Sequence, residues 1–168
     1  MSDKTNKEKT EKLFELIEDI QIAMLTTVED GHSLRSRPMW VRRREGDGQF
    51  LYCFTRDDSG KVRELCRDRH VNLAFADKGD QEYVSVSGKA SVTEDRTLID
   101  DLWSEGARAW FPDGKDDPNL AVIKISIEYA EYWDAPNGLM VTAFGWAKAR
   151  LTGEPPRGVG DNEKLGAA

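Results

Sequence analysis

The sequence predicts one mainly β domain, an antiparallel barrel of about six strands with helices packed on it. About six segments show the alternation or the β-branched apolar character of strands. Hairpin turn signals such as Asp30-Gly31 join most of them, which disfavours a parallel doubly wound sheet. Gly88 stands in the middle of one strand, where barrels place bulges and tight bends.

The expected helices and strands follow one another along most of the chain. Residues 7–20 place apolar side chains on one helical face and charged ones on the other, which predicts an amphipathic helix. Further helices are expected at residues 60–68 and, with Asp95 as the capping residue, at residues 95–111. The expected strands are residues 22–28, 33–41, 50–55, 70–76, 82–95 and 120–133.

The chain length favours a single domain. At 168 residues it is long enough for one well-buried core and short for two. We expect residues 1–136 to form this domain and residues 137–168 to form a C-terminal extension. A short helix is expected around residues 139–150, and the segment 154–168 reads as a disordered tail.

Composition excludes several classes of partner. The formal net charge of -7 argues against a nucleic-acid binder, because such proteins need a broad basic face. No apolar run approaches the roughly 20 residues that span a bilayer, and the N-terminal segment lacks the apolar stretch of a secretory signal. We therefore expect a cytoplasmic protein that binds neither nucleic acid nor membrane.

Familiar catalytic patterns are absent from the sequence. Cys53 and Cys66 are too few for a disulfide framework or a zinc site, so we expect buried free thiols. His32 and His70 are also unpaired, so we expect no metal site. There is no glycine-rich phosphate loop and no nucleophile elbow. Nothing specific supports hydrolytic or acid-base chemistry.

Several cationic positions could bind a small anion. Arg35 and Arg37 lie two residues apart and share a face of their predicted strand, and the arginine fork suits phosphate. Lys61 begins a predicted helix, where free backbone N–H groups and the helix dipole favour an anion. The alternative is that Ser59 simply caps this helix and that Lys61 is solvated.

A resemblance to a known protein family suggests one site for these cationic residues. It rests on the runs AMLTTVEDGHSLRSRPMW, FLYCFTRDDSGKVREL, VNLAFAD, YVSVSGKASV, AWFPDG and AEYWDAP, which occur in order over residues 10–136. Together they resemble the bacterial general stress proteins of the split-barrel flavin-binding family, relatives of pyridoxamine 5'-phosphate oxidase. The resemblance implies a six-stranded antiparallel split β-barrel, a homodimer, and FMN at the dimer interface, with FAD as a further possibility.

The resemblance also assigns residues to the phosphate end of the flavin. It implies that Arg37 reaches toward the phosphate and that Ser59, Gly60 and Lys61 match the Ser-Arg-Lys clamp of the oxidase. Gly60 stands where the oxidase has arginine, so one phosphate contact is missing. We expect Arg35 or Arg42 to replace it.

Other matched residues are expected beside the flavin ring. The strand with Pro38, Met39 and Trp40 passes the ring, and Phe54 and Thr55 match the aromatic-threonine step next to it. Three more aromatic residues, Tyr83, Trp110 and Trp133, belong to the expected flavin site. The resemblance brings Trp133 from the partner subunit, whereas the alternative makes it a core aromatic. Trp110 and Phe111 would pack at the interface first and contact flavin second.

Two functional classes follow from this site. The first is an FMN-dependent oxidoreductase, which passes electrons or hydride from a reduced nicotinamide or deazaflavin to a small-molecule substrate. The second is a flavin carrier or sensor without turnover. A haem-handling protein is a weaker alternative, since only His32 and His70 could serve as axial ligands. The pyridoxal-handling Arg-Leu-His-Asp-Arg run of the oxidase has no counterpart here, so pyridoxamine 5'-phosphate oxidation is not expected.

Overall fold

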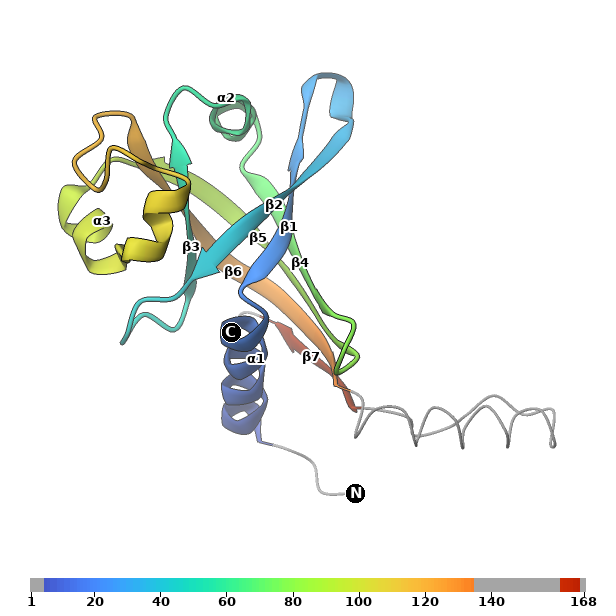
Figure 1. Ribbon diagram of the computed structural model, residues 1–168. Coiled ribbons are helices and arrows are strands. Elements are labelled where there is room, and N and C mark those ends of the chain that lie inside the picture. The colour runs from blue at the N-terminus through green and yellow to red at the C-terminus, as the bar shows by residue number, and fades with distance from the viewer. Residues whose placement is uncertain (1–4, 135–160, 167–168) are drawn as a thin grey trace, which may run out of the picture.

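The computed structural model describes residues 5–134 and 161–166 and contains a closed antiparallel barrel of six strands with a seventh strand at one edge (Figure 1). The strands are β1 (Ile22–Val28), β2 (Leu34–Arg42), β3 (Phe50–Arg56), β4 (His70–Asp77), β5 (Glu82–Thr93), β6 (Leu120–Asp134) and β7 (Asp161–Gly166). The helices are α1 (Asn6–Ile20), α2 (Gly60–Arg67) and α3 (Arg96–Leu102), with short 3-10 turns η1 (Asp30–His32) and η2 (Glu105–Ala109).

The order of the strands explains how the barrel closes. Neighbours run β3-β2-β1-β4-β5-β6-β7, and β3 also pairs with β6, which completes the ring. β6 is long enough to serve two partners in turn: residues 120–126 pair with β3, and residues 129–134 pair with β7. By contrast, β2 pairs with β3 only at Val41 and Arg42. The expected six-stranded split barrel is confirmed, and β2 and β3 diverge beyond that short contact.

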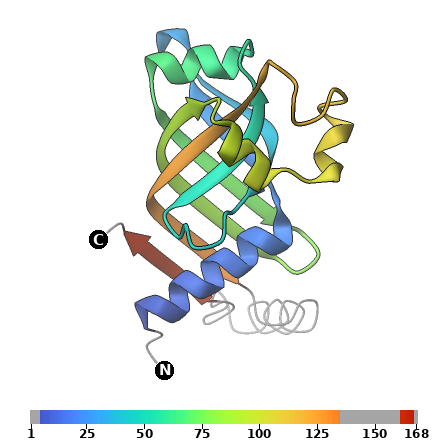
Figure 2. The same cartoon turned by 90° about the vertical axis from the view of Figure 1, so that its left-hand side faces the viewer.

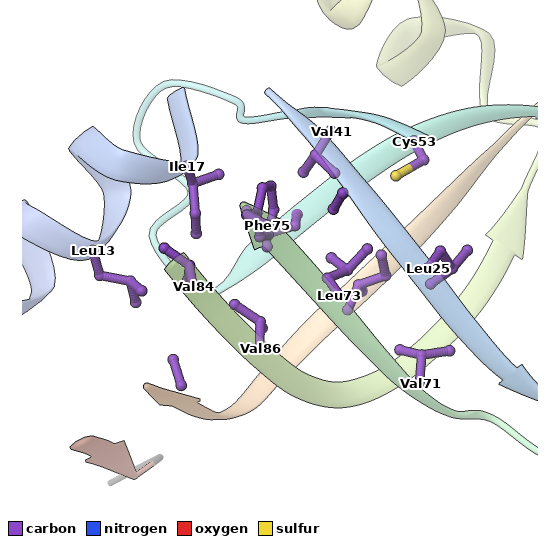
Figure 3. Packing of buried hydrophobic residues seen from close by; sticks show 14 of the residues in the cluster. Leu13, Ile17, Leu25, Val41, Cys53, Val71, Leu73, Phe75, Val84 and Val86 are labelled. Carbon is purple, nitrogen blue, oxygen red and sulfur yellow. The ribbon is translucent and has the colours of Figure 1, made fainter. Parts of the chain in front are cut away.

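The barrel interior is filled by the inward side chains of alternating strand positions (Figure 3). Burial alternates along β1 and β4 as a strand with one buried face requires. Helix α1 covers one end of the barrel, and α2 lies at the opposite end (Figures 1 and 2). Leu13 and Ile17 of α1 pack into the same core as Leu73, Phe75 and Val86. The helix predicted over residues 7–20 therefore covers one end of the barrel.

A second apolar cluster joins α3 to the outer side of β3 and β6. It contains Leu98, Ile99 and Leu102 from α3. The expected cap is present, because the Asp95 carboxylate accepts hydrogen bonds from the amides of Thr97 and Leu98. The single helix expected over residues 95–111 is instead α3 followed by η2. This break lets η2 turn back toward β2.

Two expectations fail outside the barrel core. The segment 154–168 was expected to be disordered, but Asp161–Gly166 forms β7 and pairs with β6. Lys9 of α1 also forms an ion pair with Glu163, with 2.8 Å between Nζ and Oε2. Cys66 is exposed, whereas Cys53 is buried as expected. The short helix expected around residues 139–150 lies outside the described residues.

Gly88 marks an irregularity in the pairing of β5 and β6. Ser87 faces Tyr129 while Gly88 faces Ile127, so Glu128 is an extra residue on β6 and forms a bulge. A Cβ at Gly88 would lie 1.9 Å from the backbone oxygen of Ser126. An irregularity was expected at Gly88 and is present, although the extra residue lies in the neighbouring strand β6. The close backbone approach explains why glycine stands at this position.

Replacing Gly88 by alanine should destabilise the barrel strongly. The added carbon collides with backbone rather than with a movable side chain, so we expect a loss of more than about 2 kcal/mol in the free energy of unfolding. Urea denaturation measures this loss. Gly48→Ala is the matched control, because a Cβ there meets nothing within 4 Å, and it should change stability by less than about 0.5 kcal/mol. Equal effects would contradict the close approach.

Candidate functional site

A pocket of about 370 Å³ lies where β2 and β3 diverge. The start of α2 forms one side, and η2 with the residues after it forms another. The lining residues are Ile22, Pro38, Met39, Trp40, Arg42, Phe54, Thr55, Arg56, Ser59, Lys61, Ala107, Trp110 and Phe111. The pocket therefore combines aromatic and aliphatic walls with a few cationic and hydroxyl groups, which is typical of a cofactor site.

Eight of the residues that the sequence predicted for the site line this pocket. They are Pro38, Met39, Trp40, Phe54, Thr55, Ser59, Lys61 and Trp110. The backbone of η2 approaches Trp40 closely, because a Cβ at Gly106 would lie 2.9 Å from the indole ring. This approach sets the position of η2 and of Trp110 beyond it, whose side chain is 76% exposed.

One end of the pocket is built from a lysine and two hydroxyl groups. Lys61 Nζ donates to Thr55 Oγ1 at 3.3 Å, and Thr55 Oγ1 lies 3.2 Å from Ser59 Oγ. Ser59 is the N-cap residue of α2, but its side chain makes no capping hydrogen bond. The capping alternative is therefore wrong for the Ser59 hydroxyl, which contacts Thr55 instead.

Lys61 is a partly buried cation that forms no ion pair within the described part of the chain. Burial lowers the pKa of its ammonium group, and the nearby positive charge of Arg37 lowers it further. Removing a cation from water is unfavourable, and attraction by the Glu64 carboxylate offsets only part of this cost, because the pKa of Lys61 is lowered overall. An anion at this end of the pocket would relieve that cost.

Arg42 crosses the apolar wall of the pocket. Its guanidinium carbon lies 4.1 Å from the ring centroid of Trp40 and 5.6 Å from that of Phe54. Arg42 Nη2 donates to Ser104 Oγ at 2.7 Å, and burial lowers the pKa of the guanidinium. Within residues 5–134 and 161–166 it forms no ion pair, so its charge also faces the pocket without a carboxylate.

Arg37 and Arg35 do not line the pocket. Arg37 Nη2 donates to Glu64 Oε2 at 2.7 Å, and Arg37 Nη1 donates to Thr27 Oγ1. Burial opposes ionisation of Glu64, but hydrogen bonds from Thr27 and Arg37, with the charge of Arg37, outweigh burial and lower its pKa. Arg35 pairs with Glu29 at 2.9 Å on the surface. Both arginines already have acidic partners.

Gly60, Tyr83 and Trp133 also lie outside the pocket. Gly60 begins α2 and borders a separate polar hollow with Arg35 and Glu64. Tyr83 and Trp133 face one another across β5 and β6 and are 42% and 38% exposed. Their exposure excludes the alternative that Trp133 is a core residue within this chain.

Sequence reasoning missed three lining residues, Ile22, Arg56 and Ala107. Ile22 is an outward residue of β1 and is 51% exposed, a position that strand alternation alone could have revealed. Arg56 directly follows Thr55 and contacts Asp58 and Asp117 at 3.3 and 3.4 Å. No sequence signal pointed to Ala107, since its place depends on the break between α3 and η2.

Neither metal-binding nor membrane-spanning features occur in the described residues. They contain no group of three His, Cys, Asp or Glu side chains that could hold a metal ion. They also contain no helix long and apolar enough to cross a membrane.

Comparison with known proteins identifies the family of this chain. The profile of the family described as "Pyridoxamine 5'-phosphate oxidase like" matches residues 8–157. The chain belongs to this family. General stress protein 26 of Bacillus subtilis is a 32% identical relative over 121 residues, which cover 70% of this chain and 83% of that protein.

Two crystal structures of similar proteins extend the comparison. The general stress FMN/FAD binding protein of Xanthomonas citri is 34% identical, with a TM-score of 0.68 over 80% of this chain and 94% of that one. A protein from Jannaschia sp. CCS1 has a TM-score of 0.75 over 96% of this chain and 99% of its own, at 23% identity. The second likeness establishes the fold alone, and the fold is the split barrel of the family.

Proposed function

We propose that this chain is a cytoplasmic, FMN-binding general stress-type protein and that its flavin occupies the pocket between β2 and β3. The observation that carries the proposal is Lys61, a partly buried cation that forms no ion pair among the described residues and lies next to an apolar aromatic wall. This combination suits a flat apolar ring with a phosphate at one end. The FMN/FAD-binding relative from Xanthomonas citri supports the assignment.

The phosphate would lie at the N-terminal end of α2. Lys61 supplies the charge, and the Thr55 and Ser59 hydroxyls supply hydrogen bonds. Because α2 begins at Gly60, its helix dipole would favour an anion at the same place. Gly60 has no side chain to reach the phosphate, and Arg42 is the candidate for a second cationic ligand, because it lines the pocket while Arg35 is paired with Glu29.

The ring would lie against the aromatic wall. Trp40 and Phe54 provide flat faces, and Met39 provides a polarizable one. Pro38 faces Met24 across the β1–β2 pair and completes the outer rim. When bound, the flavin would supply the redox chemistry, while these residues bind and orient it. FAD carries the same ring and first phosphate, so it remains the alternative cofactor.

A second copy of the chain would complete the site. The outer face of the sheet is uncharged along the row Pro38, Met24, Ala74 and Ser85, which are neighbours across β2, β1, β4 and β5. Met24 is 42% exposed. Burying such a face in a twofold dimer is the commonest arrangement. Tyr83 and Trp133, on the same outer face, would then reach the partner's flavin.

The pocket fits both an oxidoreductase and a flavin carrier. None of the described residues that line it has a carboxylate, an imidazole or a thiol. Since Lys61 is assigned to the phosphate, we propose no proton donor beside the ring. Hydride transfer from a reduced nicotinamide or deazaflavin needs none, and we propose this reaction toward a small-molecule acceptor. The alternative is a carrier or sensor without turnover, and the lack of a proton donor beside the ring favours it.

Lys61→Ala should weaken FMN binding and leave riboflavin binding unchanged. Loss of a charge-assisted hydrogen bond to the phosphate should cost about 1.5 to 3 kcal/mol, and riboflavin has no phosphate to lose. Flavin fluorescence quenching measures both affinities, and thermal unfolding checks the fold. Equal affinity of the wild type for the two flavins would remove the basis for this assignment.

The FMN-loaded protein should oxidise NADPH faster than free FMN does and should form no pyridoxal 5'-phosphate from pyridoxamine 5'-phosphate. The first reaction needs only an accessible flavin, while the second needs a separate cationic clamp for the substrate phosphate. The loss of NADPH absorbance measures the first reaction. An assay of pyridoxal 5'-phosphate formed under air measures the second. Absence of NADPH oxidation supports the carrier, and oxidase turnover of about 1 per second would contradict our reading of the pocket.

Light scattering should return twice the chain mass of 19.0 kDa. Met24→Arg should shift the protein toward monomer and weaken FMN binding, because it places a charge in the centre of the proposed interface. Glu11→Arg is the matched control, since Glu11 lies on the exposed side of α1 with a 65% exposed side chain. A wild-type monomer at micromolar concentration would refute the shared site.

A further inference from the structure

The polar hollow that Gly60 borders adjoins the proposed flavin pocket. It has a volume of about 410 Å³ and lies where α2 and the end of the β1–β2 hairpin come side by side (Figures 1 and 2). From α2 it is lined by four residues at the spacing of one helical face, Gly60, Arg63, Glu64 and Arg67. Ser59 and Lys61, the chain neighbours of Gly60, line the flavin pocket instead. The pocket and the polar hollow therefore meet at the start of α2.

Gly60 leaves room for a ligand to pass from the pocket into the polar hollow. A Cβ at this position would lie 3.7 Å from Arg63 Nη2 and 3.8 Å from Glu64 Oε1, which are ordinary contact distances. A side chain longer than that of alanine would therefore extend into the polar hollow, toward the Arg63 guanidinium. Because glycine has no side chain, a ligand held at Lys61 could continue past this residue.

The three carboxylates that line the polar hollow have arginine partners. They belong to the ion pairs Arg35–Glu29, Arg67–Asp30 and Arg37–Glu64. Arg63 differs, because it donates to the backbone oxygen of Asp58 at 3.0 Å and forms no ion pair within residues 5–134 and 161–166. One cation without a carboxylate partner therefore lies beside Gly60, where a second phosphate would follow the first.

These groups match the adenylate half of a dinucleotide. A guanidinium suits a phosphate, and carboxylates such as those of Glu29 and Asp30 accept hydrogen bonds from ribose hydroxyl groups. The planar guanidinium groups of Arg35 and Arg67 can stack on a flat base. A volume of about 410 Å³ also lies within the range of ligand pockets, about 300 to 1,000 Å³.

We propose that the polar hollow is an adenylate subsite, so that FMN fills the flavin pocket alone whereas FAD fills both the pocket and the hollow. Arg63 holds the second phosphate of FAD, and Glu29 and Asp30 accept from the ribose hydroxyls. This inference rests on the proposed flavin site, because the first phosphate at Lys61 brings the second one to Gly60. FAD should therefore bind at least as tightly as FMN, since its added half makes contacts of its own.

Two variants should weaken FAD binding selectively. Arg63→Gln removes the charge beside the second phosphate and should raise the Kd for FAD about tenfold. FMN has no second phosphate, so its Kd should not change. Gly60→Leu places a side chain in the path to the polar hollow and should raise the Kd for FAD about tenfold and that for FMN by less than about threefold.

Isothermal titration calorimetry of the flavin-free protein measures the affinities for FAD, FMN and riboflavin, and thermal unfolding checks the fold of each variant. A variant that still binds FMN is folded at the flavin pocket, so a loss confined to FAD is not a general loss of structure. Arg44→Gln is the control, because Arg44 pairs with Asp101 at 2.5 Å and lines neither the pocket nor the polar hollow. It changes the net charge equally and should leave every affinity unchanged.

The proposal requires the selective loss of FAD affinity in both variants. An unchanged FAD affinity in either one, or an equal loss for FAD and FMN, overturns the adenylate subsite and leaves the proposed FMN site intact. AMP that binds the FMN-loaded protein as tightly as FAD binds the flavin-free protein also overturns it, because the polar hollow would then serve a free nucleotide. A wild type that binds FMN no better than riboflavin overturns the proposed phosphate site and this inference together.

Discussion

The pairing of β3 with the first half of β6 is the constraint on which the rest of the structure depends. It closes the barrel from Phe50 opposite Ser126 to Arg56 opposite Leu120. Because β3 is held by β6 over its full length, its contact with β2 can be short. The space between the diverging strands becomes the pocket, and the turn after β3 delivers the start of α2 to its edge.

The electrostatics of the pocket follow from where acidic residues are placed. Most arginines in the described part of this acidic protein have carboxylate partners, as in the pairs Arg35–Glu29, Arg37–Glu64 and Arg44–Asp101. Lys61 and Arg42 differ, since hydroxyl groups rather than carboxylates contact them in the described structure. Two cations without ion pairs thus line the same pocket, although the net charge of the chain is -7.

Much of the fold could be read from the sequence because it depends on local periodicity. Strand alternation and the amphipathic pattern of residues 7–20 report which face is buried, and the bulge at Gly88 followed from a glycine inside a strand. β7 was missed because a short polar segment pairs with β6 through backbone groups, which leave no side-chain pattern. The domain division at residue 136 remains a proposal.

The sequence predicted which residues line the site better than it predicted which side chains contact one another. Pro38, Trp40, Phe54 and Lys61 were expected together and lie together. The partner of Arg37 could not be foreseen, because Glu64 lies 27 residues away and meets it only through the fold. Trp133 was expected at the same site but lies outside the pocket of its own chain.

The bulge opposite Gly88 changes which alternate residues of β6 face the barrel interior. Before it, the odd-numbered Ile123 and Ile125 are buried; after it, the even-numbered Ala130 and Tyr132 are buried. One strand thereby supplies the barrel interior along its whole length while Trp133 stays on the outside. Substitutions in this strand act one side chain at a time, but a deletion at the bulge would invert every following residue, exchanging Tyr132 and Trp133 between core and surface.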